Sequence, residues 1–393
     1  MLVLVAPGQG AQTPGFLAPW LDIPAVADRM TWWSAVTGVD LKYYGTDADA
    51  DEIRDTAVAQ PLLVSAALAS VLCIFPHPAD AFTLVGGAAG HSVGEISALA
   101  GTNVMSAEAA LVLVRQRGLA MAAAAAATPT GMTAVLGGDP DEVLTSLKGH
   151  GLTAANVNGA GQIVAAGTMD ELAALAADPP AKARLRPLSV AGAFHTTHMG
   201  PAVDRLATLA RAITLRDPRT RLISNADGGI VHNGRDAVDR IVRQVANPVR
   251  WDLCMQTMGD LGVTGVLEVP PAGTLTGLVK RALPGVETFA LKTPDQLTDA
   301  RDFVRTHGTQ SPMDASPTWR MLVAPMAGIF HRGDADAGAV LTPGEGVGVL
   351  VARGDDHPVS APHGGTVIEW LVEDGDPVSP GQPLIRLYPD THQ

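Results

Sequence analysis

The stretch GHSVGE, residues 90–95, constrains the fold more than any other part of this chain. It follows an apolar run at 82–89, which we predict to be a buried strand, and it leads into a helical segment at 93–100. Gly-x-Ser-x-Gly between a strand and a helix is typical of a nucleophile elbow, because its glycines permit a turn sharp enough to expose the serine. Taken alone, the pattern also fits a serine that caps a helix.

Short apolar runs and helical segments alternate from residue 1 to about residue 291, which predicts an α/β, hydrolase-like core with a parallel sheet. We assign 1–130 and 196–310 to this core. Strands are expected at 2–5, 82–89, 221–224 and 266–269, and helices at 57–75, 93–100, 107–127, 199–213, 237–245 and 295–307.

A small subdomain is predicted to be inserted at 131–195. Its segments follow the order β-α-β-β-α-β, which is ferredoxin-like. The strands are expected at 132–136, 152–156, 162–166 and 183–190, and the helices at 139–150 and 169–177.

The C-terminal part of the chain repeats itself. APMAG at 324–328 returns as APHGG at 361–365, and PGE at 343–345 returns as PGQ at 380–382, both with an offset of 37 residues. Duplicated short strands with Gly/Pro turns predict an all-β flattened barrel, here at 319–390. A polar Ser/Pro stretch at 311–318 is the expected linker.

Composition excludes several classes of function. The net charge of −13 argues against nucleic-acid binding, which needs a basic surface. The N-terminus has no basic region before its apolar residues, unlike a signal peptide. The apolar stretch at 61–75 is interrupted by serines and is predicted to be too short to span a bilayer. Cys73 and Cys254 are expected to be buried free thiols. These features predict a cytoplasmic protein without membrane contact, and no spacing of His, Cys or Asp suggests a metal.

Five motifs together resemble the malonyl-CoA:acyl-carrier-protein transacylase family in its actinobacterial form. They are GQGAQ at 8–12, GHSVG at 90–94, Arg-Gly at 117–118, GAFH at 192–195 and NPV at 247–249. The resemblance implies ping-pong transfer of a malonyl group from malonyl-CoA to the phosphopantetheine thiol of a holo acyl carrier protein, through a malonyl-serine ester and without a cofactor.

The resemblance also assigns catalytic roles. Ser92 is the expected nucleophile, and His195 is the base that takes its proton. A main-chain carbonyl, that of Gln244, holds the histidine in place of an aspartate. The backbone amides of Val93 and Gln9 are the expected donors to the oxyanion.

Substrate recognition is assigned in the same way. Arg117 is expected to pair with the free carboxylate of malonate, for which a planar guanidinium is suited. Phe194 is expected to exclude an α-methyl group. Asn156, Asn158 and Gln162 occupy the family's Asn-x-Asn…Gly-Gln loop, which faces the active-site gorge, and are expected to bind the substrate.

Alternatives remain open from the residues. His198 is a rival base, Arg115 is a rival clamp, and His91 reads as a supporting residue. A serine-type acyl-CoA or ester hydrolase, or a polyketide acyltransferase with another extender unit, would also use Ser92. The basic residues Lys182, Arg184, Arg186, Lys280 and Arg281 are either solvated surface charge or contacts for CoA phosphates and the carrier protein.

The C-terminal unit resembles a biotinyl/lipoyl domain. Residues 350–359 occupy the hairpin that carries the modified lysine in such domains, and that lysine falls at about Gly354. No lysine follows Lys292, so we expect no covalent biotin or lipoyl group. The predicted roles of this unit are docking to an acyl-CoA carboxylase, self-association, or stabilisation of the enzyme.

Overall fold

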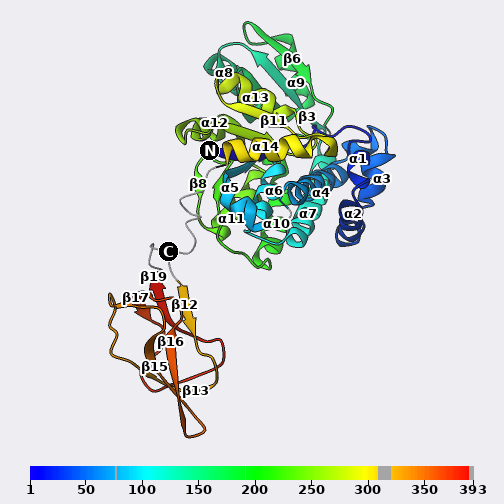
Figure 1. The fold of residues 1–393 in the computed structure, drawn as a ribbon. Helices are drawn as coiled ribbons and strands as arrows, with labels where there is room; N and C mark the ends of the chain where they lie inside the picture. The colour runs from blue at the N-terminus through cyan, green and yellow to red at the C-terminus, as the bar shows by residue number, and fades with distance from the viewer. Residues whose placement is uncertain (76–77, 191, 309–319, 389–393) are drawn as a thin grey trace. The chain divides into compact units, whose positions relative to one another are not determined.

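The protein consists of two compact units, residues 1–313 and 314–393. The structure, a computed structural model, describes residues 1–75, 78–190, 192–308 and 320–388 (Figure 1). The linker predicted at 311–318 lies outside the described residues. The mixed α/β fold expected for the first unit is confirmed.

A six-stranded sheet forms the centre of the first unit, in the order β11-β10-β1-β2-β7-β8. Its first five strands are parallel, and β8 pairs antiparallel with β7. Because parallel strands end at one edge of a sheet, the turns after β1 and β2 lie side by side. The strands are β1 Leu2–Ala6, β2 Val85–Gly90, β7 Arg221–Ile223, β8 Ile230–Val231, β10 Gly265–Glu268 and β11 Glu287–Ala290.

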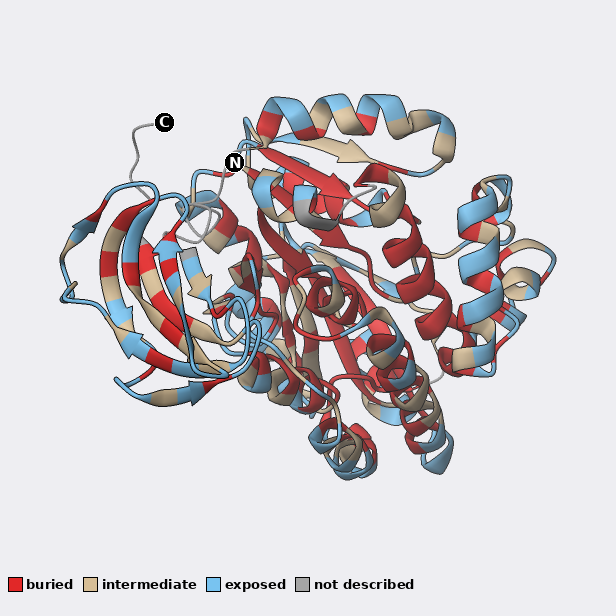
Figure 2. Ribbon diagram, turned by 60° about the horizontal axis from the view of Figure 1, so that its bottom comes forward, coloured by how far each residue is buried: buried red, intermediate tan, exposed pale blue. Residues whose placement is uncertain are grey.

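Alternate residues of β1 face opposite layers of helices. Leu2 packs into the cluster built by α4, α6 and α7, whereas Val3 and Val5 pack against α12 and α13. Figure 2 shows buried residues along the central strands and on the helix faces that cover them. The helices are α4 Thr56–Ile74, α6 Gly94–Gly101, α7 Ala107–Ala127, α12 Trp251–Asp260 and α13 Thr274–Ala282.

The remaining helices surround this core, and those before residue 50 were not predicted. They are α1 Ala18–Leu21, α2 Pro24–Thr37, α3 Leu41–Thr46, α5 Pro78–Leu84, α10 Gly200–Arg211, α11 Gly234–Gln244 and α14 Leu297–His307. Single 3₁₀ turns lie at Glu52–Arg54, Thr197–Met199 and Pro294–Gln296.

Helices α4 and α7 are long and apolar enough to cross a membrane by length and composition alone. The argument that 61–75 is too short was therefore wrong, because α4 begins at Thr56 and has 19 residues. The apolar window of α4 is 83% buried within the fold. This packing is that of a core helix.

A second sheet, in the order β6-β3-β5-β4-β9, carries the predicted β-α-β-β-α-β segments. Its fifth strand, β9 Val249–Arg250, comes from outside 131–195 and runs parallel to β4. The other elements are β3 Thr130–Gly137, α8 Pro140–Gly149, β4 Thr153–Gly159, β5 Gln162–Thr168, α9 Met169–Ala177 and β6 Ala183–Pro187.

Three further expectations about the first unit need correction. The strand predicted at 82–89 begins only at Val85, because the preceding residues complete α5; a short apolar run fits either structure. The strand predicted at 183–190 ends at Pro187, which has no N–H for a ladder. Cys73 is only partly buried, whereas Cys254 is fully buried; both are free.

The second unit consists of two four-stranded antiparallel sheets, β12-β19-β17-β14 and β16-β15-β13-β18. Its own apolar core includes Phe330, Leu350 and Leu384. Strands β15 and β16 form a hairpin whose turn residues, Arg353 and Gly354, both have positive φ. The strands are β12 Arg320–Val323, β13 Gly328–Arg332, β14 Val340–Leu341, β15 Glu345–Ala352, β16 Asp355–Ala361, β17 Gly365–Trp370, β18 Asp376–Val378 and β19 Pro383–Tyr388.

Candidate active site

Ser92 occupies the sharp turn between β2 and α6 in a left-handed conformation, with φ of 53°. The turn requires its glycines. A Cβ on Gly90 would overlap the backbone of Gly94, and a Cβ on Gly94 would overlap the carbonyl group of Ala6. The turn therefore lies directly against the end of β1, where His91 N–H donates to the Ala6 carbonyl at 2.9 Å.

His195 is the partner of this serine: its Nε2 lies 2.8 Å from Ser92 Oγ. Its Nδ1 lies 2.7 Å from the carbonyl oxygen of Gln244, and its backbone N–H donates to the Val245 carbonyl at 3.2 Å. These carbonyls belong to the end of α11, where helical carbonyl groups lack intrahelical partners. Burial, reinforced by the charge of Arg117, lowers the pKa of His195 to about 3.

Arg117 is buried on α7, with 1% of its surface exposed, and points toward the serine. Its Nη1 donates to Gln60 Oε1 at 2.8 Å, and its Nη2 donates to Gln244 Oε1 at 3.0 Å and to Ser92 Oγ at 3.3 Å. Burial lowers the pKa of Arg117 to about 10, and the charge of Glu95 opposes this shift. The guanidinium therefore remains charged at neutral pH, yet its contacts are neutral groups.

The two rival residues lie elsewhere. Arg115 donates from Nη1 to the Ala57 carbonyl at 2.7 Å, near the start of α4. His198 is half-buried in the turn at Thr197–Met199, and the contact to Ser92 Oγ comes from His195.

A small cavity opens beside Ser92 and His195. Gln9, Asn156 and Phe194 are among its lining residues. Within the described parts of the chain, the backbone amides of Gln9 and Val93 donate to no other group. The Gln9 side chain donates from Nε2 to Thr56 Oγ1 at 3.2 Å.

The other two residues of the predicted loop do not line this cavity. Asn158 Oδ1 lies 2.9 Å from His91 Nε2, and this contact orients the histidine that precedes Ser92. Gln162 stands at the start of β5, opposite Leu136. The β4 ladder has a register shift between Val157 and Gly159, so side chains near it depart from simple alternation.

Comparison with known proteins now identifies the family. The acyl transferase domain family matches residues 3–309. The malonyl CoA-acyl carrier protein transacylase of Mycobacterium tuberculosis (strain H37Rv) is 50% identical over 302 residues, which make up 76% of this chain and 99% of that protein. The chain belongs to the malonyl CoA-acyl carrier protein transacylase family.

Solved transacylase structures agree. The crystal structure of MCAT from Mycobacterium tuberculosis matches with a TM-score of 0.74 and 50% identity, covering 77% of this chain and 99% of that chain. A malonyl-transacylase in complex with its type II PKS acyl carrier protein matches with a TM-score of 0.70 and 30% identity, over the same shares. The family match ends at residue 309, so it does not include the second unit.

Two buried polar residues behind Ser92 were not predicted from the sequence of this transacylase. Asn225, which follows β7, is 0% exposed. It donates from Nδ2 to the Gly90 carbonyl and accepts at Oδ1 from the Ser92 N–H, both at 2.8 Å. Glu95 is 4% exposed on α6. The glutamate that ends the GHSVGE stretch was visible as a signal, but the partner Asn225 lies 130 residues away.

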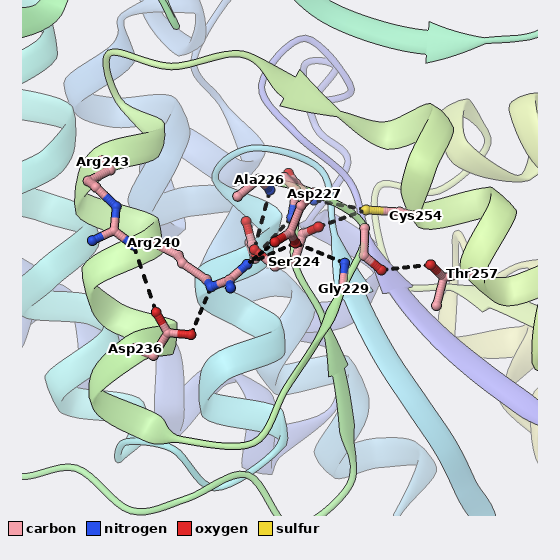
Figure 3. A network of polar contacts seen from close by, with 12 residues as sticks. Ser224, Ala226, Asp227, Gly229, Asp236, Arg240, Arg243, Cys254 and Thr257 are labelled. Atoms are coloured by element: carbon pink, nitrogen blue, oxygen red, sulfur yellow. Dashed lines mark hydrogen bonds and ion pairs between the residues drawn. The ribbon is translucent and has the colours of Figure 1, made fainter.

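The loop that carries Asn225 is itself held firmly. Figure 3 shows Arg240 between Asp227 and Asp236; its Nη1 donates to both oxygens of Asp227 at 2.8 Å, and its Nε donates to Asp236 at 2.9 Å. Thr257 Oγ1 donates to the Gly228 carbonyl at 2.7 Å from the opposite side. These contacts fix Asn225 against the turn that carries Ser92.

No metal site emerges in the part of the chain that the structure describes, where no three His, Cys, Asp or Glu side chains are grouped to hold an ion.

Proposed function

We propose that this chain moves a malonyl group from CoA to the phosphopantetheine thiol of an acyl carrier protein, through a malonyl ester of Ser92. The observation that carries the proposal is the 2.8 Å contact between Ser92 Oγ and His195 Nε2, beside a buried arginine. The 50% identity to a malonyl CoA-acyl carrier protein transacylase supports the same substrates.

His195 moves the protons in this proposal. Its Nδ1–H donates to the Gln244 carbonyl, so Nε2 carries the lone pair that faces Ser92. As Oγ bonds to the thioester carbon, the hydroxyl proton passes to Nε2; when the C–S bond breaks, that proton passes to the departing CoA sulfur. In the second half, Nε2 takes the proton of the carrier thiol, the sulfur bonds to the ester carbon, and Ser92 Oγ leaves and regains the proton.

The oxyanion formed in each half needs donors. The backbone amides of Val93 and Gln9 suit this role, because Gln9 lines the cavity, Val93 directly follows Ser92, and neither amide has another acceptor among the described residues. Each such donor typically stabilises the transition state by about 3 kcal/mol. Acyl transfer of this kind involves no redox step, and we expect it to need no cofactor.

Arg117 recognises the free carboxylate of malonate in this proposal. Gln60 and Gln244 accept from its Nη1 and Nη2 with amide oxygens and do not neutralise its charge. A substrate carboxylate would form a charge-assisted pair, whereas an acetyl group would leave the buried cation without an anionic partner. Phe194 lines the same cavity and would limit the width of the acyl group.

Basic residues near the cavity suit the phosphates of CoA and an acidic carrier protein. Arg184 and Arg186 are exposed on β6, an edge strand of the second sheet, and Lys182 directly precedes it. Two residues beyond Arg186, Leu188 lines the active-site cavity.

The chain division is proposed as the sequence predicts: an α/β core at 1–130 and 196–310, a ferredoxin-like subdomain at 131–195 and a biotinyl/lipoyl-like unit at 319–390. The internal repeat and the two four-stranded sheets support the last of these. The hairpin turn there is Arg353-Gly354. No lysine follows Lys292, so the unit has no lysine to modify. We propose a cytoplasmic location, in which the free thiols Cys73 and Cys254 stay reduced.

Docking of the second unit to an acyl-CoA carboxylase, and self-association through it, are further proposals. Co-purification with the carboxylase and sizing of the native assembly, each with and without residues 319–393, test them. Loss of the complex or of the larger assembly on truncation supports the respective role, and identical results contradict it.

The proposed transfer is tested with radiolabelled malonyl-CoA and a holo acyl carrier protein. Label is expected on Ser92 first and on the carrier protein after it is added, and Ser92→Ala should abolish both. Release of free malonate in preference to transfer would identify a hydrolase instead.

A further inference from the structure

The carboxyl group of Glu95 lies behind the active site and takes no part in the steps above. Glu95 belongs to the first turn of α6 and is almost fully buried. Burial raises the pKa of Glu95 to about 8, against the opposing effect of its hydrogen bonds. A buried carboxyl group is costly unless it is well partnered, so its partners indicate its role.

Both oxygens of Glu95 accept hydrogen bonds. Oε1 accepts from the backbone N–H of Asn225 at 3.1 Å, and Oε2 accepts from Nε2 of Gln244 at 2.6 Å. The oxygen of the same Gln244 amide accepts from Arg117 Nη2 at 3.0 Å, and that Nη2 also donates to Ser92 Oγ at 3.3 Å. A chain of hydrogen bonds therefore leads from Glu95 through Gln244 and Arg117 to the nucleophile.

The donor and acceptor directions in this series of hydrogen bonds are fixed at both ends. Arg117 carries only donors, and both oxygens of Glu95 are occupied as acceptors of N–H bonds. Gln244 carries both, so it satisfies its neighbours in one orientation, with nitrogen toward Glu95 and oxygen toward Arg117. Asn225 Oδ1, at 3.1 Å from Gln244 Nε2, is a second acceptor that favours the same orientation.

The separation of Glu95 from Arg117 by one amide also favours selection of the acyl group by Arg117. A carboxylate in direct contact with Arg117 would neutralise it and compete with the carboxylate of the substrate. With one amide between them, Glu95 still raises the pKa of Arg117 and offsets part of the cost of burial. The hydrogen-bond acceptors of Arg117 are neutral, so its charge is left for the carboxylate of the acyl group.

We propose that Glu95 is a positioning residue for acyl-group selection: it orients the Gln244 amide, and this amide aims Arg117 at the acyl group on Ser92. The inference rests on the proposed function, because it deepens the role given there to Arg117. Among the described residues, the Glu95 carboxyl group makes no hydrogen bond to Ser92 or His195, so it acts through Gln244.

Glu95→Gln in the full chain tests this. The variant keeps the shape of the side chain but offers one acceptor oxygen to two N–H donors. The NH2 group of the new glutamine then faces the NH2 group of Gln244. Rotation of the Gln244 amide relieves this contact but turns its acceptor oxygen away from Arg117. We expect kcat/KM for malonyl loading of Ser92 to fall about tenfold or more, while acetyl loading changes much less.

A double-mutant cycle with Gln244→Met distinguishes action through the Gln244 amide from a merely structural role of Glu95. Gln244→Met removes the amide but keeps the backbone carbonyl that holds His195. If Glu95 acts through this amide, Gln244→Met shows the same loss of malonyl selection, and the double variant loses no more than the worse single variant. Should Glu95→Gln fail to fold, Gln244→Met alone still has to lose selection. The inference would be overturned if the losses of the two single variants multiply in the double variant. An unchanged malonyl-to-acetyl ratio in either single variant would also overturn it.

Glu268→Gln is the matched control. Glu268 is also fully buried, and its carboxylate accepts N–H bonds from Leu275 and Thr276 at the start of α13. We expect lower stability with an unchanged malonyl-to-acetyl ratio; an equal loss of selection in this control would overturn the inference. If wild type fails to load malonyl on Ser92, the proposed function itself fails. If wild type loads it and Arg117→Ala loses selection while Glu95→Gln does not, only the role of Glu95 fails.

Discussion

Ser92 Oγ and His195 Nε2 lie 2.8 Å apart although 103 residues separate them in the sequence. Both residues have left-handed backbone conformations, with φ of 53° and 63°. Such conformations cost about 1–3 kcal/mol each in residues other than glycine and persist only where the surroundings determine them. Asn225 supplies that support for Ser92, and the end of α11 supplies it for His195.

Replacing the base should slow formation of the malonyl ester. His195→Gln removes the proton acceptor that faces Ser92, and general-base catalysis is worth about 10²–10⁴-fold in rate. We expect a fall of at least about a hundredfold in single-turnover labelling by malonyl-CoA. His198→Asn, three residues away, serves as the control and should label at nearly the wild-type rate; a comparable loss there would contradict the assignment of the base.

Removing the guanidinium should change acyl selection. Arg117→Ala deletes the charged partner of the malonyl carboxylate, and we expect kcat/KM for malonyl-CoA to fall about tenfold to a hundredfold while acetyl-CoA is spared or improved. Parallel loading assays with the two thioesters measure this ratio. Arg115→Ala removes a helix-start contact instead and should preserve the ratio. If Arg117→Ala leaves the malonyl-to-acetyl ratio unchanged, Arg117 does not bind the malonyl carboxylate.

Stability should depend on pH through His195. Because burial lowers its pKa from 6.5 to about 3, the unfolded chain binds a proton in this window and the folded chain does not. Its contribution to the free energy of unfolding is therefore complete above about pH 6.5 and is lost as the pH falls toward 3. Glu95, with its raised pKa, has the opposite sign: its contribution is lost as the pH rises from about 4.5 through 8.

The two effects are separated by comparing wild type with His195→Asn in urea denaturation between pH 4 and 8. The difference in free energy of unfolding between the two proteins should shrink as the pH falls below 6.5. A difference that stays constant over this range would show that His195 is not held neutral by burial.

Asn225 should matter for activity although it is outside the family motifs quoted above. Asn225→Ala removes the acceptor of the Ser92 N–H and the donor to the Gly90 carbonyl, so the turn loses support on both sides. Loss of buried hydrogen bonds of this kind costs about 1–3 kcal/mol. We expect a lower melting temperature and slower labelling of Ser92. Labelling at the wild-type rate by a fully folded variant would refute the support role.

Much of the active site could be anticipated from residues close together in sequence. The glycines around Ser92 predict a sharp turn by local sterics, and the structure has that turn. The alanine run 122–127 predicts helix by propensity, and it completes α7. The strand expected at 82–89 was placed too early because an apolar run of this length carries no period that separates a strand from a short helix.

The sequence by itself determined most of the elements, the elbow and the chemical types that surround it, because these depend on backbone sterics and on neighbours a few residues apart. Only the tertiary structure decided that the carbonyl of Gln244 reaches His195, that its amide reaches Arg117, and that Glu95 and Asn225 lie behind them. These contacts join α6, α7, α11 and the loop after β7, and no local pattern encodes a distance between elements that meet only when the sheet assembles.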